Sequence, residues 1–496
     1  MISRRRLLDY CFLTSLVNEE HEAYFPTAGP AYLARDYFRP ATLGRARGWW
    51  KNTLALIDEG RAPKELGLYV HWPFCSRRCA FCFCSTRVPK DAAEVRDYAA
   101  GLKAEMDSLK DLFGGRAFGS VYFGGGTPTF GDEEVLDDLL THLRRSFKVA
   151  SWAEFYYEAS PATLTPEKMR LLRRHGVNHV TLGVQTMDPG VLKRIDRRGQ
   201  TREVVDKAYG LMAREKGLIR SVDLMYGLEG QGKRSFLSDV VWAMKRRCHN
   251  LRIYAFDPRP QTRFASEGKP VRSGFREDQF TMMRLLDKAT ELYGYRLASS
   301  HPDFKDYLCG ITRQCRVARR WGASVLGFGP SALSHAFGSA WYRRPVAGGA
   351  RFEGFPSGLL EEMRGYAVRQ LYTPGEIPRA PFKALFGRDI LEVSALAEAL
   401  RGLEASGKLR LEKGSARFLS VERVERQVWG KHLFSPVLRA ALLRSAAKER
   451  RAFLKRHART PMDELIPLSG KRVAALMRMY YHPSTPVLPL RRESRA

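Results

Sequence analysis

The sequence predicts an α/β fold in which a parallel sheet forms an open or partial (β/α) barrel. From about residue 66, short β-rich runs alternate with longer helical patterns at spacings of a few tens of residues, which is typical of parallel sheets. The helical patterns carry apolar residues every three to four positions, as expected of helices that cover the outside of a barrel. In such barrels the chemistry takes place at the carboxyl ends of the strands, so polar residues at those ends are candidates for a site.

Six strands are expected, with a helix between each pair. They are residues 65–71, 119–125, 153–159, 178–184, 220–227 and 251–256. Helical periodicity is clearest over residues 95–113 and 132–147, which follow the first and the second strand.

The alternation fades after about residue 300, and this change divides the chain. We expect an N-terminal helical extension (1–60), the partial barrel (61–300), a Gly-rich connection that completes the barrel (301–355) and a mainly helical, winged-helix-like domain (356–496). The last domain is expected to contain a short hairpin around Lys413 and Gly414 and to end in a basic tail.

Composition excludes several protein classes. The 496 residues are 44% hydrophobic and 27% charged, so the chain can bury a sizeable core and is not disordered, collagen-like or coiled-coil. A net charge of +30 makes polyanions, acidic membrane surfaces and carboxylate-rich substrates suitable partners. No run of about 18 apolar residues occurs, and Asp9 interrupts the N-terminal apolar run, so we expect no membrane span and a cytoplasmic location.

Four of the eight cysteines lie within ten residues, directly after the first strand. Cys75, Cys79 and Cys82 have the spacing CxxxCxxC, and Cys84 follows. Structural zinc usually takes ligands from two separated cysteine pairs, whereas three thiolates in one loop suit one face of an iron–sulfur cube whose fourth iron stays open. A disulfide framework is not expected with so few cysteines in a chain of this size.

The segment YVHWPFC(x3)C(x2)CxC resembles the cluster loop of the radical S-adenosylmethionine (SAM) enzymes, and more narrowly of the oxygen-independent coproporphyrinogen III dehydrogenase branch. The resemblance implies a radical SAM barrel in which Cys75, Cys79 and Cys82 hold three irons of a 4Fe-4S cluster while adenosylmethionine chelates the fourth. One electron, from a flavodoxin or ferredoxin-type donor, then yields a 5'-deoxyadenosyl radical that abstracts a substrate hydrogen. Cys84 is the candidate catalytic residue, with a substrate-side or supporting role.

Further residues match the resemblance at successive strand ends. The turn FGGGTPT lets the backbone approach a ligand, and it lacks the Gly-Lys-Ser/Thr continuation of a phosphate loop. The implied adenosylmethionine site comprises Tyr69, Gly124, Gly125, Gly126, Thr127, Glu158, Gln185, Arg197, Asp223 and Ala255. The choice of Arg197 over its neighbour Arg198 follows from the family register alone.

The resemblance covers roughly residues 60–430 and leaves three functions open. The first is a porphyrinogen-type dehydrogenase, for which EAYFPTA at residues 22–28 is the nearest counterpart of a substrate-covering segment. The second is a radical methyltransferase or cyclopropanase that uses two adenosylmethionines on a peptide, haem or natural product. The third is a haem chaperone, against which Cys84 argues. A nucleic-acid role is not expected, because no recognised binding module accompanies the basic tail.

Overall fold

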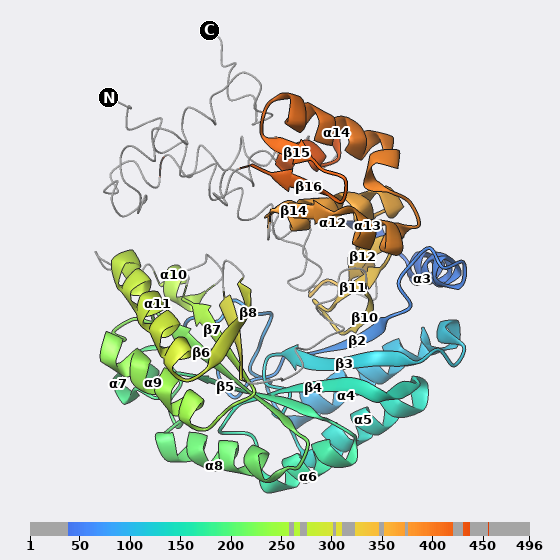
Figure 1. The fold of residues 1–496 in the computed structure, drawn as a ribbon. Coiled ribbons are helices and arrows are strands. Elements are labelled where there is room, and N and C mark those ends of the chain that lie inside the picture. Colours follow the sequence, from blue (N-terminus) through green and yellow to red (C-terminus); the bar gives the residue numbers. More distant parts are fainter. Residues whose placement is uncertain are drawn as a thin grey trace.

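The computed structural model describes residues 38–256, 262–267, 275–300, 304–309, 323–346, 352–372, 375–419, 430–436 and 455. Within these ranges one large sheet curves through the molecule, with helices along its outer side (Figure 1). The sheet has 13 strands in the order β1-β13-β12-β11-β10-β2-β3-β4-β5-β6-β7-β9-β8. Because β1 and β8 lie at its two ends and do not pair with each other, the sheet forms an open barrel.

The strands of this sheet divide into a parallel centre and antiparallel flanks. The centre consists of β10 (Ser324–Phe328), β2 (Leu66–Trp72), β3 (Phe118–Gly125), β4 (Val149–Ala159), β5 (His179–Gln185), β6 (Ile219–Tyr226) and β7 (Asn250–Ala255). The flanks consist of β1 (Arg39–Ala41), β8 (Tyr295–Ser300), β9 (Phe304–Cys309), β11 (Leu333–Ala336), β12 (Ala340–Arg343) and β13 (Phe352–Pro356).

All six predicted strands are present as β2 to β7, and the α/β fold class is confirmed. The parallel centre has a seventh strand, β10, which falls in the segment predicted to be a Gly-rich connection. Its partner is β2, with Leu326 opposite Leu68. A pairing between segments so far apart along the chain leaves no local pattern in the sequence. The expected boundary at residues 300 and 301 falls between β8 and β9, which are paired strands of the same sheet.

Helices connect the parallel strands and cover the outer face of the sheet. They are α3 (Leu43–Asp58), α4 (Ala92–Asp107), η1 (Lys110–Phe113), α5 (Glu133–Ser146), α6 (Pro166–Arg174), α7 (Pro189–Arg194), α8 (Arg202–Arg214), α9 (Lys233–Lys245), α10 (Arg263–Ser266) and α11 (Phe275–Leu292). Asp91, Thr165 and Thr201 cap α4, α6 and α8 through side-chain oxygens that accept hydrogen bonds from backbone N–H groups. These caps explain why the helices begin where they do.

The alternation along each strand separates an apolar outer face from a polar inner face. In β3, Val121 and Phe123 are at most 1% exposed and belong to the core, whereas Tyr122 lies between them on the other face. In β6, Val222 and Leu224 are fully buried in the same core. The inner face is therefore free to carry polar groups at the strand ends.

The C-terminal unit combines helices with a small antiparallel sheet of order β14-β16-β15. Its elements are α12 (Leu359–Tyr372), β14 (Glu376–Pro378), α13 (Arg379–Phe386), η2 (Ile390–Glu392), α14 (Ser394–Ala405), β15 (Leu409–Leu411), β16 (Ser415–Phe418) and η3 (Lys431–Leu433). The predicted hairpin around Lys413 and Gly414 is present between β15 and β16.

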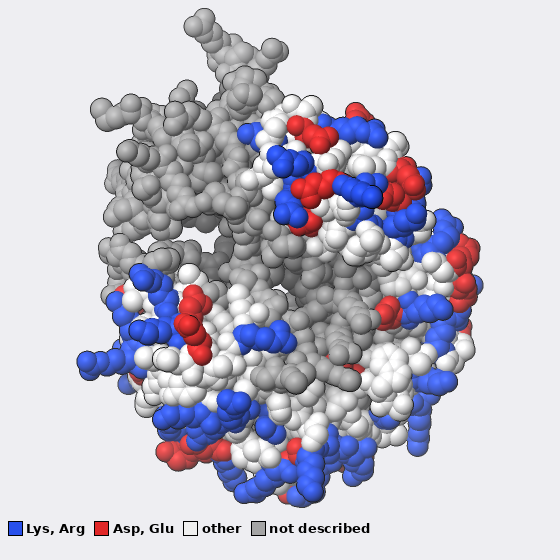
Figure 2. Space-filling view, viewed as in Figure 1, with Lys and Arg blue, Asp and Glu red and all other residues white. Residues whose placement is uncertain are grey.

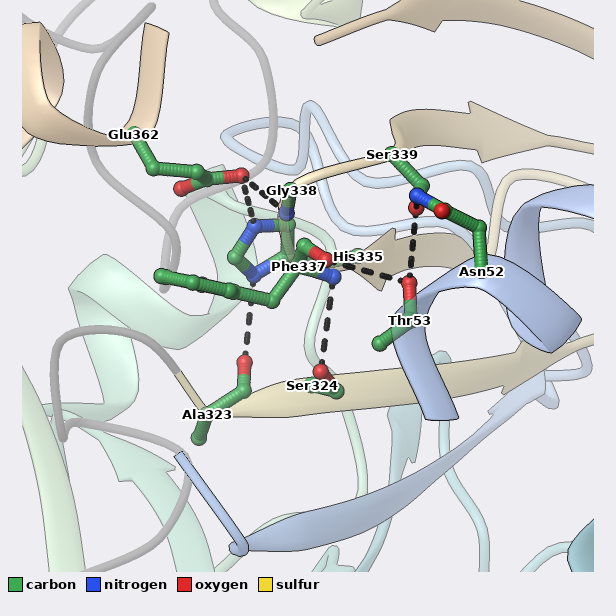
Figure 3. A network of polar contacts seen from close by, with 9 residues as sticks. All are labelled: Asn52, Thr53, Ala323, Ser324, His335, Phe337, Gly338, Ser339 and Glu362. Atoms are coloured by element: carbon green, nitrogen blue, oxygen red, sulfur yellow. Dashed lines mark hydrogen bonds and ion pairs between the residues drawn. The ribbon is translucent and has the colours of Figure 1, made fainter. Parts of the chain in front are cut away.

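A buried polar network joins this unit to the large sheet (Figure 3). His335 of β11 lies 2.8 Å from Glu362 of α12 through Nε2, and 3.1 Å from the Ala323 carbonyl through Nδ1. Both side chains are at most 3% exposed. The two ring nitrogens of His335 thus bind one oxygen next to β10 and one on α12.

No helix among the described residues is long and apolar enough to cross a membrane. The segment at residues 22–28 and most of the basic tail lie outside the described residues.

Candidate active site

The four clustered cysteines lie in the loop that follows β2. Cys75, Cys79 and Cys82 are partly exposed, and Cys84 is exposed. Cys84 donates a hydrogen bond to the Cys82 sulfur, which lowers the pKa of Cys82 to about 6 and raises the pKa of Cys84. Burial acts in the opposite direction on Cys75 and raises its pKa to about 11.

Arg197 contacts this loop through its guanidinium group. Its Nη1 lies 3.6 Å from the Cys79 sulfur, while its Nε donates to Gln200 at 2.8 Å. Its Nη2 donates to the Gly183 carbonyl at the end of β5. These contacts point Arg197 into the barrel, whereas Arg198 has a side chain that is 66% exposed. The structure thus separates two neighbours that sequence reasoning could separate only by family register.

The glycine turn after β3 packs directly against the start of the cysteine loop. Gly126 donates its N–H to the Trp72 carbonyl at 2.7 Å, and Thr127 donates to the Phe74 carbonyl at 2.9 Å. A Cβ on Gly126 would lie 2.8 Å from the Phe74 oxygen. The Thr127 hydroxyl also lies 3.4 Å from the Cys75 sulfur. The glycines therefore bring the end of β3 against the backbone that carries the cysteines.

Glu158 lies at the end of β4, beside this turn. It accepts hydrogen bonds from the Tyr122 hydroxyl and, at 3.3 Å, from the Gly125 N–H. Burial raises the pKa of Glu158, while Tyr122, the charge of Arg252 and the Gly125 N–H act in the opposite direction. The carboxylate is therefore held in place by fixed donors at the mouth of the barrel.

Gln185 ends β5 with a strained backbone. Its φ is 67°, a left-handed value that is unfavourable for a residue with a side chain, and the register between β5 and β6 shifts at this point. Its Oε1 is buried and has no hydrogen-bond partner in the described part of the chain. Asp239 secures the next residues, since it accepts from the Thr186 hydroxyl at 2.7 Å and from the Met187 N–H at 3.2 Å. Strain held in place by such contacts, with an unsatisfied amide oxygen beside it, makes this strand end a candidate ligand site.

Asp223 and Ala255 lie on the two following strands. Asp223 of β6 is 9% exposed and lies in register with Gly183 of β5 and Arg252 of β7. Ala255 ends β7 opposite Tyr226, and its side chain is partly exposed. The predicted residues from β4 to β7 therefore follow one another around the rim of the same barrel end.

Tyr69 and His71 connect the inner wall of the barrel to the loop that carries Cys84. The Tyr69 hydroxyl lies 3.0 Å from His71 Nδ1, and His71 Nε2 lies 2.9 Å from the Ser85 carbonyl. The carbonyl can only accept, so Nε2 carries the proton and Nδ1 accepts from Tyr69. Burial lowers the pKa of His71, which favours this neutral form. A relay of two hydrogen bonds thus fixes the backbone next to Cys84.

Several inner-wall residues were not among the predicted site residues. Tyr122 and Tyr156 stack at a centroid distance of 4.4 Å, and Tyr156 meets His179 edge-on at 4.3 Å. Arg252 donates to the Tyr254 hydroxyl at 3.4 Å. The sequence could have identified three of them, because Tyr122, Tyr156 and His71 lie two positions from the predicted residues Gly124, Glu158 and Tyr69 along their strands. Strand periodicity places residues two positions apart on the same face, which covers these three residues.

Comparison with known proteins shows which family this part of the chain resembles. The model of the "Radical SAM superfamily" matches residues 69–243, which contain the cysteine loop and the strands from β3 to β6. The chain contains a radical SAM domain over these residues. The prediction of the family from the cysteine loop and the strand-end residues is confirmed.

Curated relatives with this radical SAM domain include two functional classes. The chain is 28% identical to the oxygen-independent coproporphyrinogen III oxidase of Bradyrhizobium diazoefficiens over 63% of this chain and 71% of that one. It is 29% identical to the enzyme of the same name from Paracoccus denitrificans over 68% of this chain and 75% of that one. It is also 27% identical to a heme chaperone (HemW) of Buchnera aphidicola over 40% and 52% of the two chains.

Among solved structures, coproporphyrinogen III oxidase (HemN) from Escherichia coli has the same fold. The TM-score is 0.64 over 82% of this chain and 96% of that one, with 20% sequence identity. A coverage of 82% means that the likeness extends beyond the radical SAM domain of residues 69–243.

The radical SAM family implies a 4Fe-4S cluster and adenosylmethionine, and the described residues fit both. No three His, Cys, Asp or Glu side chains in the described ranges converge as they would on a single metal ion. A four-iron cube is larger, and each thiolate binds a different iron. Cys75, Cys79 and Cys82 on one short loop suit that arrangement. The buried amide oxygen of Gln185, which has no hydrogen-bond partner among the described residues, could accept a hydrogen bond from a polar ligand such as adenosylmethionine.

Proposed function

We propose that the protein is a radical SAM oxidoreductase that acts on a tetrapyrrole of the coproporphyrinogen type. The observation that carries the proposal is the convergence on one side of the barrel of the cysteine loop, the Gly124–Thr127 turn and the polar residues Glu158, Gln185 and Asp223 of β4, β5 and β6. The names of the two coproporphyrinogen III oxidases support the substrate class. A net charge of +30 supports a substrate that carries several carboxylates.

In this proposal Cys75, Cys79 and Cys82 would hold a 4Fe-4S cluster, and the predicted residues of β4 to β7, together with Arg197, would hold adenosylmethionine. When bound, the two groups supply the one-electron chemistry that generates a 5'-deoxyadenosyl radical for hydrogen abstraction from the substrate.

The chain's own residues position and shield these groups. Glu158, fixed by Tyr122 and Gly125, offers its remaining lone pairs to ribose hydroxyls, with Asp223 as the second carboxylate. Arg197 already directs one guanidinium edge toward Cys79, which suits the carboxylate of the methionine. The inner wall of tyrosines below Glu158 fills the barrel and excludes water from the reacting groups.

Cys84 is proposed as the catalytic residue on the substrate side. It is exposed and lies next to Ser85, whose carbonyl and hydroxyl contact His71 and Ser331 at 2.9 Å each. A thiol held on a fixed backbone at the open side of the cluster loop is placed to meet a substrate.

A haem chaperone is a second candidate, because the relatives include proteins of that name. It would bind haem without consuming adenosylmethionine. Titration of haem into the protein, with and without the cluster, tests this candidate directly.

The decisive experiment is anaerobic. The cluster is reconstituted, dithionite, adenosylmethionine and coproporphyrinogen III are added, and 5'-deoxyadenosine, S-adenosylhomocysteine and the tetrapyrrole are followed by mass spectrometry. Deoxyadenosine with stepwise loss of carboxylates supports the proposal. Deoxyadenosine with an unchanged tetrapyrrole would contradict the substrate, and S-adenosylhomocysteine would then indicate a methyltransferase.

Two cysteine variants separate cluster binding from turnover. We expect Cys79→Ala to lose the visible absorbance and the iron of the reconstituted cluster, because a ligand is removed. Cys84→Ala should keep both and lose turnover, measured as deoxyadenosine and product formed. Loss of iron in Cys84→Ala would show instead that Cys84 is a ligand.

A further inference from the structure

We propose that the loops at the amino ends of β4 to β7 form a surface that attaches the protein peripherally to an anionic lipid membrane. Glu158 and Gln185 lie at the opposite, carboxyl ends of β4 and β5, so a membrane bound here leaves the candidate active site uncovered. The proposal goes beyond the proposed function and does not depend on it.

Four helix-to-strand loops meet at this surface. Because β4, β5, β6 and β7 are parallel neighbours in the sheet, the segments that lead into them lie side by side. These segments, here called the basic loops, are residues 144–152, 173–178, 214–219 and 245–250. They contain ten Lys or Arg residues and one acidic residue, Glu215. Figure 2 shows Lys and Arg side chains gathered at the lower edge of the molecule, where α6 and α8 lie in Figure 1.

Hydrogen bonds join each basic loop to the next. Arg144 donates to the His175 carbonyl at 2.9 Å, and Arg173 donates to the Lys216 carbonyl at 2.9 Å. The Arg220 N–H, directly after the third loop, donates to His249 Nδ1 at 3.0 Å. The charged groups are therefore displayed on one fixed surface.

Most of this positive charge is exposed to solvent. The exposed members of the ten are Arg144, Arg145, Lys148, Arg174, Arg214, Lys216, Lys245 and Arg247. Three acids pair with members of the ten: Asp137 with Arg174 at 2.6 Å, Glu215 with Arg173 at 3.2 Å and Asp206 with Arg246 at 2.6 Å. The basic loops therefore keep a net positive charge.

The helix dipole explains only part of this charge. Cations in the last turn of a helix are stabilised by its C-terminal end, which accounts for the basic residues that end α5, α6, α8 and α9. Lys148, Lys216 and Arg247 lie beyond those helices and are exposed. The surface thus carries more positive charge than the helix ends use.

The two most exposed large hydrophobic side chains of the described residues lie beside the basic loops. Leu292 is 75% exposed and Trp152 is 68% exposed. Trp152 precedes Ala153, whose carbonyl accepts a hydrogen bond from the Asn178 side chain at 2.8 Å. Leu292 ends α11, and the Tyr295 hydroxyl just after it donates to the Cys248 carbonyl at 2.7 Å. The apolar groups therefore accompany the first and the last basic loop.

This combination fits the interface of an anionic membrane. Acidic headgroups attract exposed Lys and Arg side chains, and Trp and Leu side chains gain an apolar environment at the boundary between headgroups and acyl chains. A nucleic acid would supply phosphates but no apolar environment for Leu292. An anionic lipid surface satisfies both features.

The test measures binding of the full chain to vesicles by co-sedimentation at several salt concentrations. The vesicles consist of phosphatidylcholine alone or of phosphatidylcholine with phosphatidylglycerol. The variant is Arg145→Gln, Lys148→Gln, Lys216→Gln and Lys245→Gln combined. The matched control is Lys51→Gln, Arg96→Gln, Arg410→Gln and Lys413→Gln combined, which removes the same charge from exposed positions elsewhere.

We expect the wild type to bind only the vesicles that contain phosphatidylglycerol and to be released as salt is added. The variant should bind at least about tenfold more weakly, and the control should bind as the wild type does. Lys148→Gln with Lys216→Gln should give an intermediate loss, which keeps the test valid if the fourfold variant folds poorly.

A second measurement addresses the apolar contacts. Brominated lipids quench tryptophans that enter the bilayer, so we expect them to quench the wild type and to quench Trp152→Phe less at equal amounts of bound protein. Leu292→Ser should weaken vesicle binding several-fold.

Absence of binding by the wild type, or equal binding to both kinds of vesicle, would overturn the membrane surface. Equal losses in the variant and the control would also overturn it, because the net charge of the whole chain would then explain the binding. Release of the wild type from vesicles by a short RNA duplex, together with unchanged binding of Leu292→Ser and equal quenching of Trp152→Phe, would assign the surface to nucleic acid instead.

Discussion

At the scale of single residues, Gln185 shows how the backbone serves the site. Its left-handed φ of 67° occurs where the β5–β6 register shifts, and its buried amide oxygen has no hydrogen-bond partner in the described part of the chain. Asp239 fixes the two residues that follow. Burial raises the pKa of Asp239 to about 6, so the burial of this supporting carboxylate costs free energy.

We predict that Gln185→Gly leaves the stability of the protein nearly unchanged but weakens the binding of adenosylmethionine. Glycine adopts positive φ without strain, so the stability of the variant should stay within about 1 kcal/mol of the wild type. The affinity for adenosylmethionine, measured by equilibrium dialysis on the reconstituted protein, should fall several-fold because the amide is gone.

Arg247→Gly provides the matched control for this variant. Arg247 also has a positive φ, of 52°, but it follows α9 away from the barrel end. It should change stability to a similar extent and leave the affinity for adenosylmethionine unaltered. A loss of affinity in both variants would assign the effect to the backbone and not to the Gln185 amide.

At the scale of elements, the site depends on how closely the end of β3 approaches the cysteine loop. Two backbone hydrogen bonds join the glycine turn to Trp72 and Phe74, and a glycine is required where they form. The turn is therefore part of the scaffold of the cysteine loop as well as a surface for a ligand.

We predict that Gly126→Ala destabilises the protein by about 1–3 kcal/mol, because the added methyl group meets rigid backbone atoms. The reconstituted variant should also hold less iron, since the loop would be displaced from the end of β3. Urea unfolding and an iron assay measure the two effects.

Gly101→Ala is the control for steric crowding. Gly101 lies within α4, and a Cβ there meets nothing within 4 Å. Alanine at this helical position should stabilise by about 0.5–1 kcal/mol and leave the iron content as it is. Normal iron content in Gly126→Ala would contradict the scaffold role of the turn.

At the scale of the whole molecule, the C-terminal unit is joined to the sheet through a buried hydrogen-bonded pair (Figure 3). His335 and Glu362 are far apart in the sequence and bond at 2.8 Å in the interior. The Gly338 N–H donates to the same Glu362 oxygen at 3.2 Å, and Trp341 stacks on the His335 ring at a centroid distance of 3.7 Å.

Glu362→Ala should therefore destabilise the protein by about 1–3 kcal/mol or more, because the buried His335 ring and the Gly338 N–H lose their shared partner. Denaturant unfolding followed by tryptophan fluorescence measures the change, and Trp341 reports on the junction itself. Glu59→Ala, which removes an exposed pair with Arg61, should cost at most about 1 kcal/mol. Similar costs for the two variants would show that the buried pair does not stabilise the junction.

The sequence by itself determined the six central strands, the family and the order of the strand-end residues, because these depend on local patterns. Alternation places Val121 and Phe123 in the core. The spacing of Cys75, Cys79 and Cys82 can be recognised in the sequence without knowledge of any residue distant along the chain. The residue types at 158, 185, 197 and 223 follow one another as the strands do, so their meeting at one barrel end follows from parallel topology.

Only the tertiary structure decided features that depend on contacts between distant segments. Three features have no local pattern in the sequence. They are the pairing of β10 with β2, the turn of Arg197 toward Cys79 while Arg198 faces outward, and the ion pairs of Arg77, Arg198 and Arg263 with Asp196. The physical reason is the range of the forces involved. Periodicity and backbone propensity act within a few residues, whereas hydrogen bonds and charge pairs are chosen only when the folded chain brings their partners together.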